Sequence, residues 1–428
     1  MRRLLFLEPG HFHAALTLRM PHPALADEIV VYSSEGPELR DFLALVDRFN
    51  RRSESPTRWR PVVVTCLDSL PRLVEERRGD VVVLAGKNGG KARTIQRLHA
   101  SGFHVLADKP WLVKHDDLVP IQASLDRWPL VAEIMTGRHD TAARLLQRLV
   151  GTPDVFGGFR AESPAFELES VHHLEKLVDG APLRRPWWFF DVRVQGSGAV
   201  DIPTHQVDMT QWLVNGAEAT SPAGLRLLSA RAWPTSVPVE AFRRITGHPT
   251  FPPELQPRGD GDTLSYLCNA ELSYQIGGVV ARASARWDLV TPPGGGDSSR
   301  AVAHGTRADV CLEQGALTGH QRWLTIQSPS DANGVARALR ETVTAWQAEF
   351  PGVSVEPDGA GRHRITIPPM LATGHESHFA RVLDEFLRAV DEHRWPAERT
   401  RRTLAKYTLL AEAAAAVSLQ SGDRSTPP

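Results

Sequence analysis

The chain has 428 residues, which at about 150 residues per domain allows two or three domains and excludes a small disulfide-stabilised scaffold. Hydrophobic residues make up 42% of the sequence and charged residues 23%, so a mainly disordered chain is excluded as well. The 49 Lys and Arg nearly balance the 50 Asp and Glu, and a net charge of −1 provides no overall attraction for nucleic acid or an anionic membrane.

The cysteines and the apolar runs bear on the compartment. Cys66, Cys268 and Cys311 are widely separated and fit neither a disulfide framework nor a zinc ribbon. The apolar run Leu4–Leu7 is too short for the core of a signal peptide, and no apolar stretch reaches the roughly 18 residues of a membrane span. We therefore expect a cytoplasmic protein with no membrane and no nucleic-acid partner.

In the first 137 residues, short apolar runs alternate with amphipathic segments, the order of repeated strand–helix units. The predicted strands are Leu4–Leu7, Glu28–Tyr32, Pro61–Thr65, Asp80–Ala85, His104–Ala107 and Pro129–Met135. The predicted helices are Phe42–Phe49, Leu70–Glu76, Ala92–Ala100 and Asp116–Leu125. This alternation predicts an α/β fold with a Rossmann-type, doubly wound parallel sheet that binds a dinucleotide, over residues 1–137.

The pattern changes after residue 137. A helix is predicted over Thr141–Val150, and alternating apolar and polar residues predict strands at Gly157–Glu162, Leu264–Ile276, Gly278–Leu289, Ala308–Glu313 and Arg322–Ile326. Two helices follow, one from Gly374 and one from Pro396 to about Val417. We assign residues 138–417 to an α+β domain for substrate binding and oligomerisation, with a large open, mostly antiparallel sheet, and expect residues 418–428 to be a disordered tail.

The turn after the first strand is a degenerate form of a dinucleotide-binding turn. The pattern G-x-G-x-x-G brings the backbone close to a pyrophosphate, but here only the middle glycine, Gly10, is present. Glu8 and His13 stand at the other two positions. Gly10, His11 and Phe12 are candidate cofactor-binding residues, and an ordinary strand-to-helix turn is the alternative.

The end of the second strand is where an acid reads the adenosine ribose in such folds. Ser33 in that place admits the 2′-phosphate of NADP, whereas Glu35 binds the free 2′-hydroxyl of NAD. Both residues are candidates, and the sequence leaves the choice between the two cofactors open.

Polar turns also follow the fourth and fifth predicted strands, the second of them with the sequence Asp108-Lys109-Pro110. A lysine at the carboxyl end of a parallel strand faces the ligand crevice. The two turns resemble the glucose-fructose oxidoreductase and inositol dehydrogenase family, in a longer-chained branch, with Asp108 in place of the family's Glu. The resemblance covers roughly residues 1–215 and implies NAD or NADP binding by Gly86, Asn88, Lys91, Asp108 and Lys109.

A glycine-rich turn at Gly196–Gly198 leads to Asp201, Pro203 and His205. If Pro203 begins a helix, Asp201 and His205 point the same way, and the carboxylate orients an imidazole that acts as a base near neutral pH. The resemblance implies catalytic roles for Lys109, Asp201 and His205. The alternatives are a helix cap for Asp201 and a structural histidine at position 205.

Aromatic and polar residues between these motifs suit a sugar, whose apolar face stacks on rings while its hydroxyls take hydrogen bonds. A buried aromatic cluster is the alternative explanation. Arg138, after the sixth strand, falls near the nicotinamide in the resembling family or forms an ion pair between domains. The substrate-side candidates are His173, Lys176, Trp188 and Asp191, together with Asp201 and His205. No metal site is predicted, because His375 and His378 lack a recognisable third ligand.

Together these features predict an NAD(P)-dependent oxidoreductase that acts on a CH–OH group of a sugar, glycoside or cyclic polyol. One alternative is a redox-neutral enzyme with tightly bound NAD that oxidises a glycoside transiently before elimination or epimerisation. Another is a non-catalytic nucleotide-dependent regulator or scaffold, which the degenerate glycine turn favours. The resemblance also implies a homodimer or homotetramer.

Overall fold

The computed structural model describes residues 1–125, 127–162, 164–178, 181–214, 218–255, 261–293 and 295–422. Its first sheet is parallel throughout, with the strand order β3-β2-β1-β4-β5-β6. The strands are β1 (Leu4–Leu7), β2 (Glu28–Ser33), β3 (Arg60–Thr65), β4 (Val81–Leu84), β5 (His104–Asp108) and β6 (Val131–Ile134). The predicted doubly wound fold is confirmed.

Apart from the edge strand β3, which is partly exposed, the strands of this sheet are buried on both faces, which is why they are continuous apolar runs. One face packs against α3 (Ser69–Glu76), α4 (Lys91–Ala100) and α5 (Leu118–Ser124), and the other against α1 (His13–Leu16) and α2 (Pro37–Arg51). Alternate residues of a strand serve the two faces: Leu5 and Leu7 lie in one core, Leu4 and Phe6 in the other.

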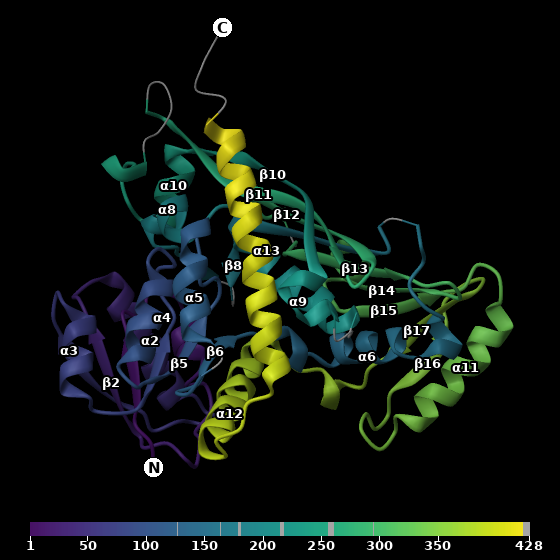
Figure 1. Ribbon diagram of the computed structural model, residues 1–428, viewed down its shortest axis with the longest axis horizontal. Coiled ribbons are helices and arrows are strands. Elements are labelled where there is room, and N and C mark those ends of the chain that lie inside the picture. The colour runs from purple at the N-terminus through teal and green to yellow at the C-terminus, as the bar shows by residue number, and fades with distance from the viewer. Residues whose placement is uncertain are drawn as a thin grey trace, which may run out of the picture.

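The second sheet is mixed and mostly antiparallel, with the order β10-β11-β12-β7-β13-β14-β15-β17-β16, and only the pair β12 and β7 is parallel among the described strands. It lies beside the first sheet in Figure 1. Its strands are β7 (Phe166–Glu175), β10 (Leu225–Pro238), β11 (Thr263–Ile276), β12 (Val279–Val290), β13 (Ser298–His304), β14 (Asp309–Gln314), β15 (Trp323–Gln327), β16 (Ser354–Pro357) and β17 (Arg362–Thr366). A separate short pair is β8 (Leu177–Val178) and β9 (Ala181–Pro182).

The helices of the second half begin with α6 (Thr141–Val150), as predicted. The others are α7 (Pro153–Phe156), α8 (Val192–Gln195), α9 (Pro203–Val214), α10 (Val239–Thr246), α11 (Ala332–Ala345), α12 (His378–Asp391) and α13 (Ala397–Gly422). The segment Gly157–Glu162 is not a strand, contrary to prediction: Gly157 adopts φ +80°, and only Phe159 forms an isolated bridge, to Gly305.

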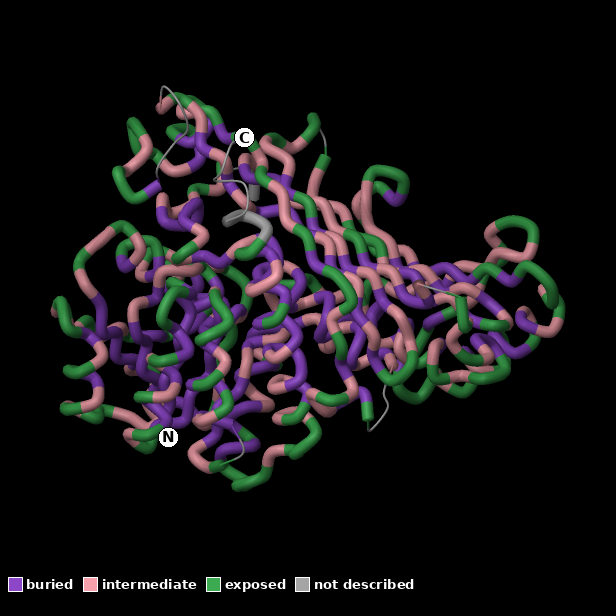
Figure 2. The backbone as a smooth tube through the Cα atoms, turned by 45° about the horizontal axis from the view of Figure 1, so that its top comes forward, coloured by how far each residue is buried: buried purple, intermediate pink, exposed green. Residues whose placement is uncertain are grey.

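The two C-terminal helices join the halves of the molecule. α12 packs on β5 and β6 of the first sheet, and the long α13 runs between the halves and contacts α5, α9 and β10 (Figure 1). Buried residues therefore continue from one sheet to the other (Figure 2). α13 continues to Gly422, five residues past its predicted end, and the rest of the predicted disordered tail, residues 423–428, lies outside the described residues. Among the residues described, no helix is long and apolar enough to cross a bilayer.

Candidate functional site

Lys109 and Asp201 form an ion pair between the two halves of the molecule. Lys109 follows β5, and Asp201 lies in the turn before α9, which begins at Pro203 as predicted. The Lys109 Nζ donates to Asp201 Oδ1 at 2.7 Å, and the two side chains are only 10% and 9% exposed. Gly198 makes this turn possible, because a Cβ there would lie 2.5 Å from the backbone of Asn269 on β11.

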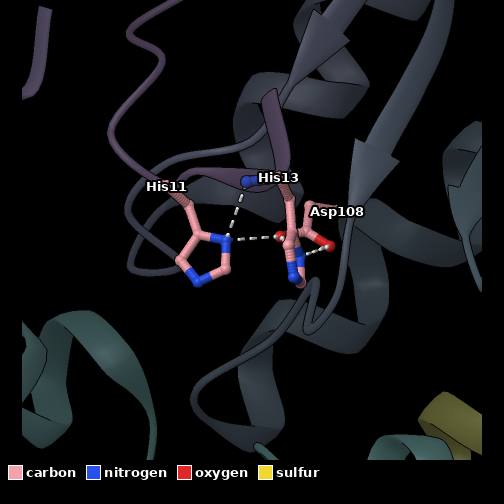
Figure 3. A group of neighbouring side chains, drawn as sticks. All are labelled: His11, His13 and Asp108. Atoms are coloured by element: carbon pink, nitrogen blue, oxygen red, sulfur yellow. Dashed lines mark hydrogen bonds and ion pairs between the residues drawn. The ribbon is translucent and has the colours of Figure 1, made fainter. Parts of the chain in front are cut away.

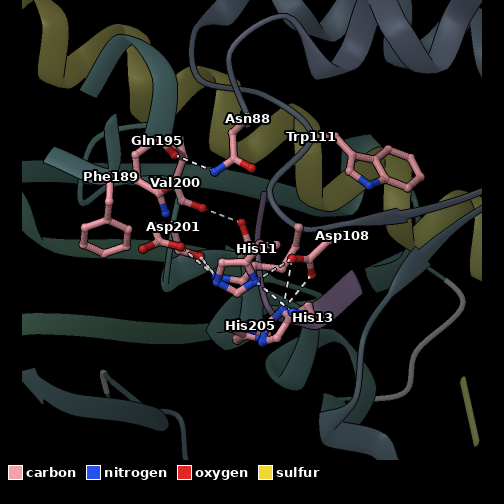
Figure 4. A network of polar contacts seen from close by, with 12 residues as sticks. His11, His13, Asn88, Asp108, Trp111, Phe189, Gln195, Val200, Asp201 and His205 are labelled. Atoms are coloured by element: carbon pink, nitrogen blue, oxygen red, sulfur yellow. Dashed lines mark hydrogen bonds and ion pairs between the residues drawn. The ribbon is translucent and has the colours of Figure 1, made fainter. Parts of the chain in front are cut away.

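His205 stands in the first turn of α9, close to this pair. Its Nδ1 lies 3.2 Å from the Sδ of Met135 (Figure 4 shows the surroundings). Burial, followed by the nearby charges of Lys109, His375 and His13, lowers the pKa of His205 well below 6.5. The imidazole is therefore neutral at pH 7 and able to accept a proton. Asp201 holds Lys109, which differs from the expectation that it orients His205.

A second polar group lies beside His205 at the ends of β1 and β5. The His13 Nδ1 lies 3.1 and 3.0 Å from the two carboxylate oxygens of Asp108, and the His11 Nδ1 lies 3.5 Å from one of them (Figure 3). Asp108 and His13 are buried. Asp108 was predicted to bind the cofactor. His13 was noted from the sequence only because it replaces the third glycine of the fingerprint.

A cavity of about 460 Å³ opens where β1, β2 and β4 end, the ligand-binding edge of a doubly wound sheet. Four predicted cofactor residues are among those that line it: Gly10, Ser33, Gly86 and Lys91. Gly86 has to be a glycine, since a Cβ there would clash with the Glu8 carbonyl oxygen. The turns after β1 and β4 thus pack closely together. Gly10, the remaining glycine of the fingerprint, lies at this contact.

Glu8 is a cavity residue that the sequence analysis discounted. Its Oε1 accepts hydrogen bonds from the Ser69 Oγ at 2.6 Å and the Ser34 amide at 3.1 Å, and its Oε2 from the hydroxyls of Ser33 and Ser34 at 3.2 Å. Its φ is +44°, in the left-handed region that glycine prefers. Glu8 thus has a backbone conformation that suits the first glycine of the fingerprint, and its side chain adds a carboxylate.

Lys91 connects the cavity with the Lys109 site. Its Nζ donates to the Asn88 Oδ1 at 2.6 Å and to the backbone oxygen of Asp108 at 2.9 Å. Burial lowers the pKa of Lys91 to about 8, so the ammonium is still mostly charged at pH 7. Asn88 in turn donates to the Gln195 carbonyl at 2.8 Å, so it joins the two halves of the molecule instead of lining the cavity.

Seven predicted cofactor residues lie outside the cavity lining: His11, Phe12, Glu35, Asn88, Asp108, Lys109 and Arg138. Glu35 and Phe12 are exposed. Arg138 makes a bidentate ion pair with Asp208, with distances of 2.7 and 3.0 Å. For Arg138 the structure therefore shows the alternative considered from the sequence, an ion pair at the interface.

The substrate-side candidates are divided between three places. His173 and Lys176 both contact Asp297, the lysine at 2.6 Å and the histidine at 3.2 Å, and no local motif identified that carboxylate. Trp188 lies on the wall of the cavity against Gly10 and donates from its Nε1 to Glu38 at 2.9 Å.

Asp191 has a structural environment. It caps α8 by accepting from the Arg193 amide and pairs with the Arg193 guanidinium at 2.8 Å. The aromatic segment next to it belongs to a buried cluster with Phe189, Phe190 and Tyr266, which is the alternative weighed from the sequence.

Comparisons with known proteins agree with this architecture. The family model described as "Putative oxidoreductase C terminal domain" matches residues 145–418. The chain is also 33% identical to a putative oxidoreductase from Parabacteroides merdae, with 98% of each chain covered and a TM-score of 0.93. The chain belongs to this oxidoreductase family. The resemblance found in its sequence is thereby confirmed.

More distant structures share the fold of this oxidoreductase. GenD2 from gentamicin A biosynthesis, in complex with NAD, is 14% identical, with 99% of this chain and 95% of that chain covered and a TM-score of 0.57. KijD10, a 3-ketoreductase from Actinomadura kijaniata in complex with NADP and TDP-benzene, is also 14% identical, with 97% and 98% covered and a TM-score of 0.58. No curated protein matches the chain.

Proposed function

We propose that the protein transfers a hydride between a nicotinamide cofactor and a secondary alcohol or ketone of a sugar, glycoside or cyclic polyol. The observation that carries this proposal is the buried pair of Lys109 and Asp201 beside a neutral His205, next to the cavity at the carboxyl ends of β1, β2 and β4. Such a group of an ammonium and a neutral base suits the deprotonation of a hydroxyl.

The residues of the cavity fit a dinucleotide. Glu8 and three serine hydroxyls offer acceptors and donors for a ribose diol, and Lys87 and Lys91 offer positive charge for phosphates. Glu8, Glu38 and Asp68 place three carboxylates on the wall, which disfavours the 2′-phosphate of NADP. We therefore propose NAD as the cofactor; when bound, its nicotinamide supplies the hydride acceptor or donor.

The side chains then have distinct tasks. In alcohol oxidation the His205 imidazole accepts the hydroxyl proton, and the Lys109 ammonium stabilises the negative charge that develops on the oxygen. Asp201 is a positioning residue that fixes the Lys109 Nζ through the 2.7 Å contact. In the reduction of a ketone, His205 returns the proton to the same oxygen.

A carbohydrate-like substrate is supported by the polar groups that surround this pair. The Arg185 guanidinium is buried over the rings of Phe189 and Trp287, and its pKa, lowered by burial, is affected by the charges of both Asp297 and Asp201. The carboxylate of Asp297, paired with His173 and Lys176, therefore lies near the same guanidinium as Asp201. A hydroxyl-rich ligand finds several directional partners there.

The test combines cofactor identification with two variants. Mass spectrometry of nucleotide released from denatured protein and titration with NAD and NADP identify the cofactor, and turnover is followed at the nicotinamide absorbance with sugars and cyclic polyols. Lys109→Met and His205→Asn are expected to lower kcat/KM by about 10²- to 10⁴-fold. The exposed Lys114→Met is the control and is expected to leave kcat/KM unchanged.

The outcomes separate this proposal from the two alternatives. Stoichiometric NAD that stays bound without net turnover of free nucleotide supports the redox-neutral enzyme. Nucleotide binding without turnover of any substrate, and unchanged in both variants, supports the regulator. Failure to carry or bind either nucleotide rejects the proposal.

A further inference from the structure

Two histidines and one carboxylate converge where β1 and β5 end. His11 lies in the turn after β1, His13 is the first residue of α1, and Asp108 is the last residue of β5. The potential ligand atoms of all three side chains lie within 4.8 Å of one another (Figure 3). The two imidazole rings are 4.1 Å apart, centre to centre, and nearly perpendicular, so their Nδ1 atoms face the carboxylate from different directions.

The contacts of His11 within this group are long. The His11 Nδ1 lies 3.4 Å from the His13 amide nitrogen and 3.5 Å from an Asp108 carboxylate oxygen. A protonated Nδ1 donates to the carboxylate, whereas an unprotonated Nδ1 offers one lone pair, either to the amide or to a cation. A cation between the three side chains would bind the lone pairs of both imidazoles and the carboxylate together, in place of the 3.4 Å amide contact.

The spacing of the donors matches a transition-metal site. Bonds of about 2.0–2.2 Å to nitrogen and oxygen separate tetrahedral ligands by roughly 3.3–3.6 Å and octahedral neighbours by roughly 2.9–3.1 Å. The carboxylate oxygens of Asp108 lie 3.0 and 3.5 Å from the Nδ1 atoms of His13 and His11. We propose that His11, His13 and Asp108 bind a divalent cation of the zinc and iron(II) class.

The surroundings leave the carboxylate available and the site partly open. Lys91 donates to the backbone oxygen of Asp108 and Lys109 donates to Asp201, so neither ammonium occupies the Asp108 carboxylate. The side chains of Asp108 and His13 are 5% and 11% exposed, whereas that of His11 is 28% exposed. Three protein ligands and an opening on the His11 side leave coordination positions for water or a substrate oxygen.

The proposed metal site does not depend on the proposed hydride transfer. The positions of the three ligands do not depend on a bound nucleotide, and the cation would lie beside His205, whose pKa responds to the charges of His13 and Asp108. His13, which replaces the third glycine of the fingerprint, thus acts in this proposal as a metal ligand. A test with the metal alone, in the absence of nucleotide, separates this inference from the proposed cofactor.

The experiment uses the full-length protein after chelator treatment and dialysis. Titration with Co²⁺ is followed by visible absorption, and Zn²⁺ binding is measured by calorimetry. One equivalent per chain is expected. His11→Ala and Asp108→Asn are each expected to weaken binding at least about tenfold, because even outer-sphere partners of metal ligands contribute about 10- to 100-fold.

His22→Asn provides the matched control. His22 pairs with one carboxylate, Asp384, at 3.3 Å, and is expected to leave metal affinity unchanged. Circular dichroism establishes that Asp108→Asn folds, and His11→Ala, at a partly exposed position, tests the same site if it does not. The proposal is overturned by the lack of stoichiometric binding, by unchanged affinity in His11→Ala, or by an equal loss in His22→Asn.

Discussion

Glu8 is the cavity residue on which the proposed preference for NAD depends. A non-glycine residue at φ +44° costs roughly 1–2 kcal/mol, and such conformations persist where the surroundings enforce them. Here the hydrogen bonds from Ser33, Ser34 and Ser69 hold the carboxylate in the cavity. We therefore propose that the ribose acceptor, which the sequence predicted at the end of β2, is supplied from the end of β1.

Glu8→Gln is expected to reduce discrimination against NADP. The amide keeps the size of the side chain but removes its charge, and a hydrogen bond to a charged group contributes about 1.5–3 kcal/mol. We expect NAD to bind roughly 10- to 100-fold more weakly, with the ratio of the NADP and NAD dissociation constants falling. Fluorescence titration with both nucleotides measures this ratio.

Glu35→Gln serves as the control for Glu8→Gln, because Glu35 is the ribose-reading candidate of the sequence and the structure places it exposed, outside the cavity lining. Its dissociation constants should match those of the unaltered protein. If Glu35→Gln changed the dissociation constants more than Glu8→Gln, the ribose contact would have to be assigned to the end of β2 and not to Glu8.

His205 determines the pH dependence expected in alcohol oxidation. A free imidazole is protonated below about pH 6.5 and cannot accept a proton, but burial and the charges of Lys109, His375 and His13 lower the pKa of His205 well below 6.5. We expect kcat/KM to stay level as the pH falls from 7 through 6.5 and to decline only at more acidic pH. A pH profile in which kcat/KM already declines toward acidic pH at or above pH 6.5 would contradict this.

α13 carries a buried charge into the junction between the two sheets. Lys406 on this helix is fully buried and pairs with Glu133 of β6 and with Asp208 of α9, the latter at 3.3 Å. Tyr407 also donates to Glu133, and Arg138 clamps Asp208. Three elements distant in sequence are thereby joined by one network of charges.

Lys406→Met should destabilise the folded protein by about 3–5 kcal/mol, because it leaves two buried carboxylates without their shared cation. Urea unfolding followed by circular dichroism measures the loss. Arg401→Met, at an exposed position of the same helix, is the comparison and should change the free energy of unfolding by no more than about 0.5 kcal/mol. If the two variants changed the free energy of unfolding equally, the charge network would not contribute to the stability of the protein as proposed.

Individual elements could be predicted where the periodicity of the sequence was undisturbed. All six strands of the first sheet lie within two residues of their predicted bounds. Five of them are continuous apolar runs because they are buried on both faces, whereas the edge strand β3 was recognisable from its β-branched residues although it is partly exposed. β10 was missed for a physical reason: its register with β11 shifts at Leu227/Ser229 and Trp233/Thr235, and such bulges break the alternation of two. The domain boundary after residue 137 stays a prediction.

At the scale of the whole molecule, the site is an assembly of segments far apart in the chain. Lys109 and Asp201 could be found from local motifs, and the structure joins them across 92 positions. Asp297, Glu8 and His13 could not, because their significance comes from partners brought by the fold, as with the contact of Asp297 to Lys176. Trp188 was recognisable as an aromatic residue, but only the packing of the two halves places it against Gly10.

Buried histidines spread over the molecule make its stability sensitive to mild acid. Burial, as the main cause, lowers the pKa of His104 and His139 to about 4. Between pH 6.5 and pH 4 the unfolded chain binds protons at these residues and the folded chain does not, so the free energy of unfolding falls as the pH falls through this window. Asp208 and Asp297, whose pKa values are lowered despite their burial, weaken folding only below their ordinary pKa near 3.8.

His104 tests this point away from the candidate site. Its Nδ1 accepts the Leu130 amide at 2.9 Å, a hydrogen bond that only the neutral ring can make. From pH 7 to pH 5 each of these two histidines should cost on the order of 1 kcal/mol of stability, measured by urea unfolding at both values. His104→Asn keeps an acceptor without titrating, so its loss should be smaller by about one such contribution. An unfolding free energy that is the same at pH 7 and pH 5, or the same slope in His104→Asn, would show that these rings are solvated or charged in the folded state.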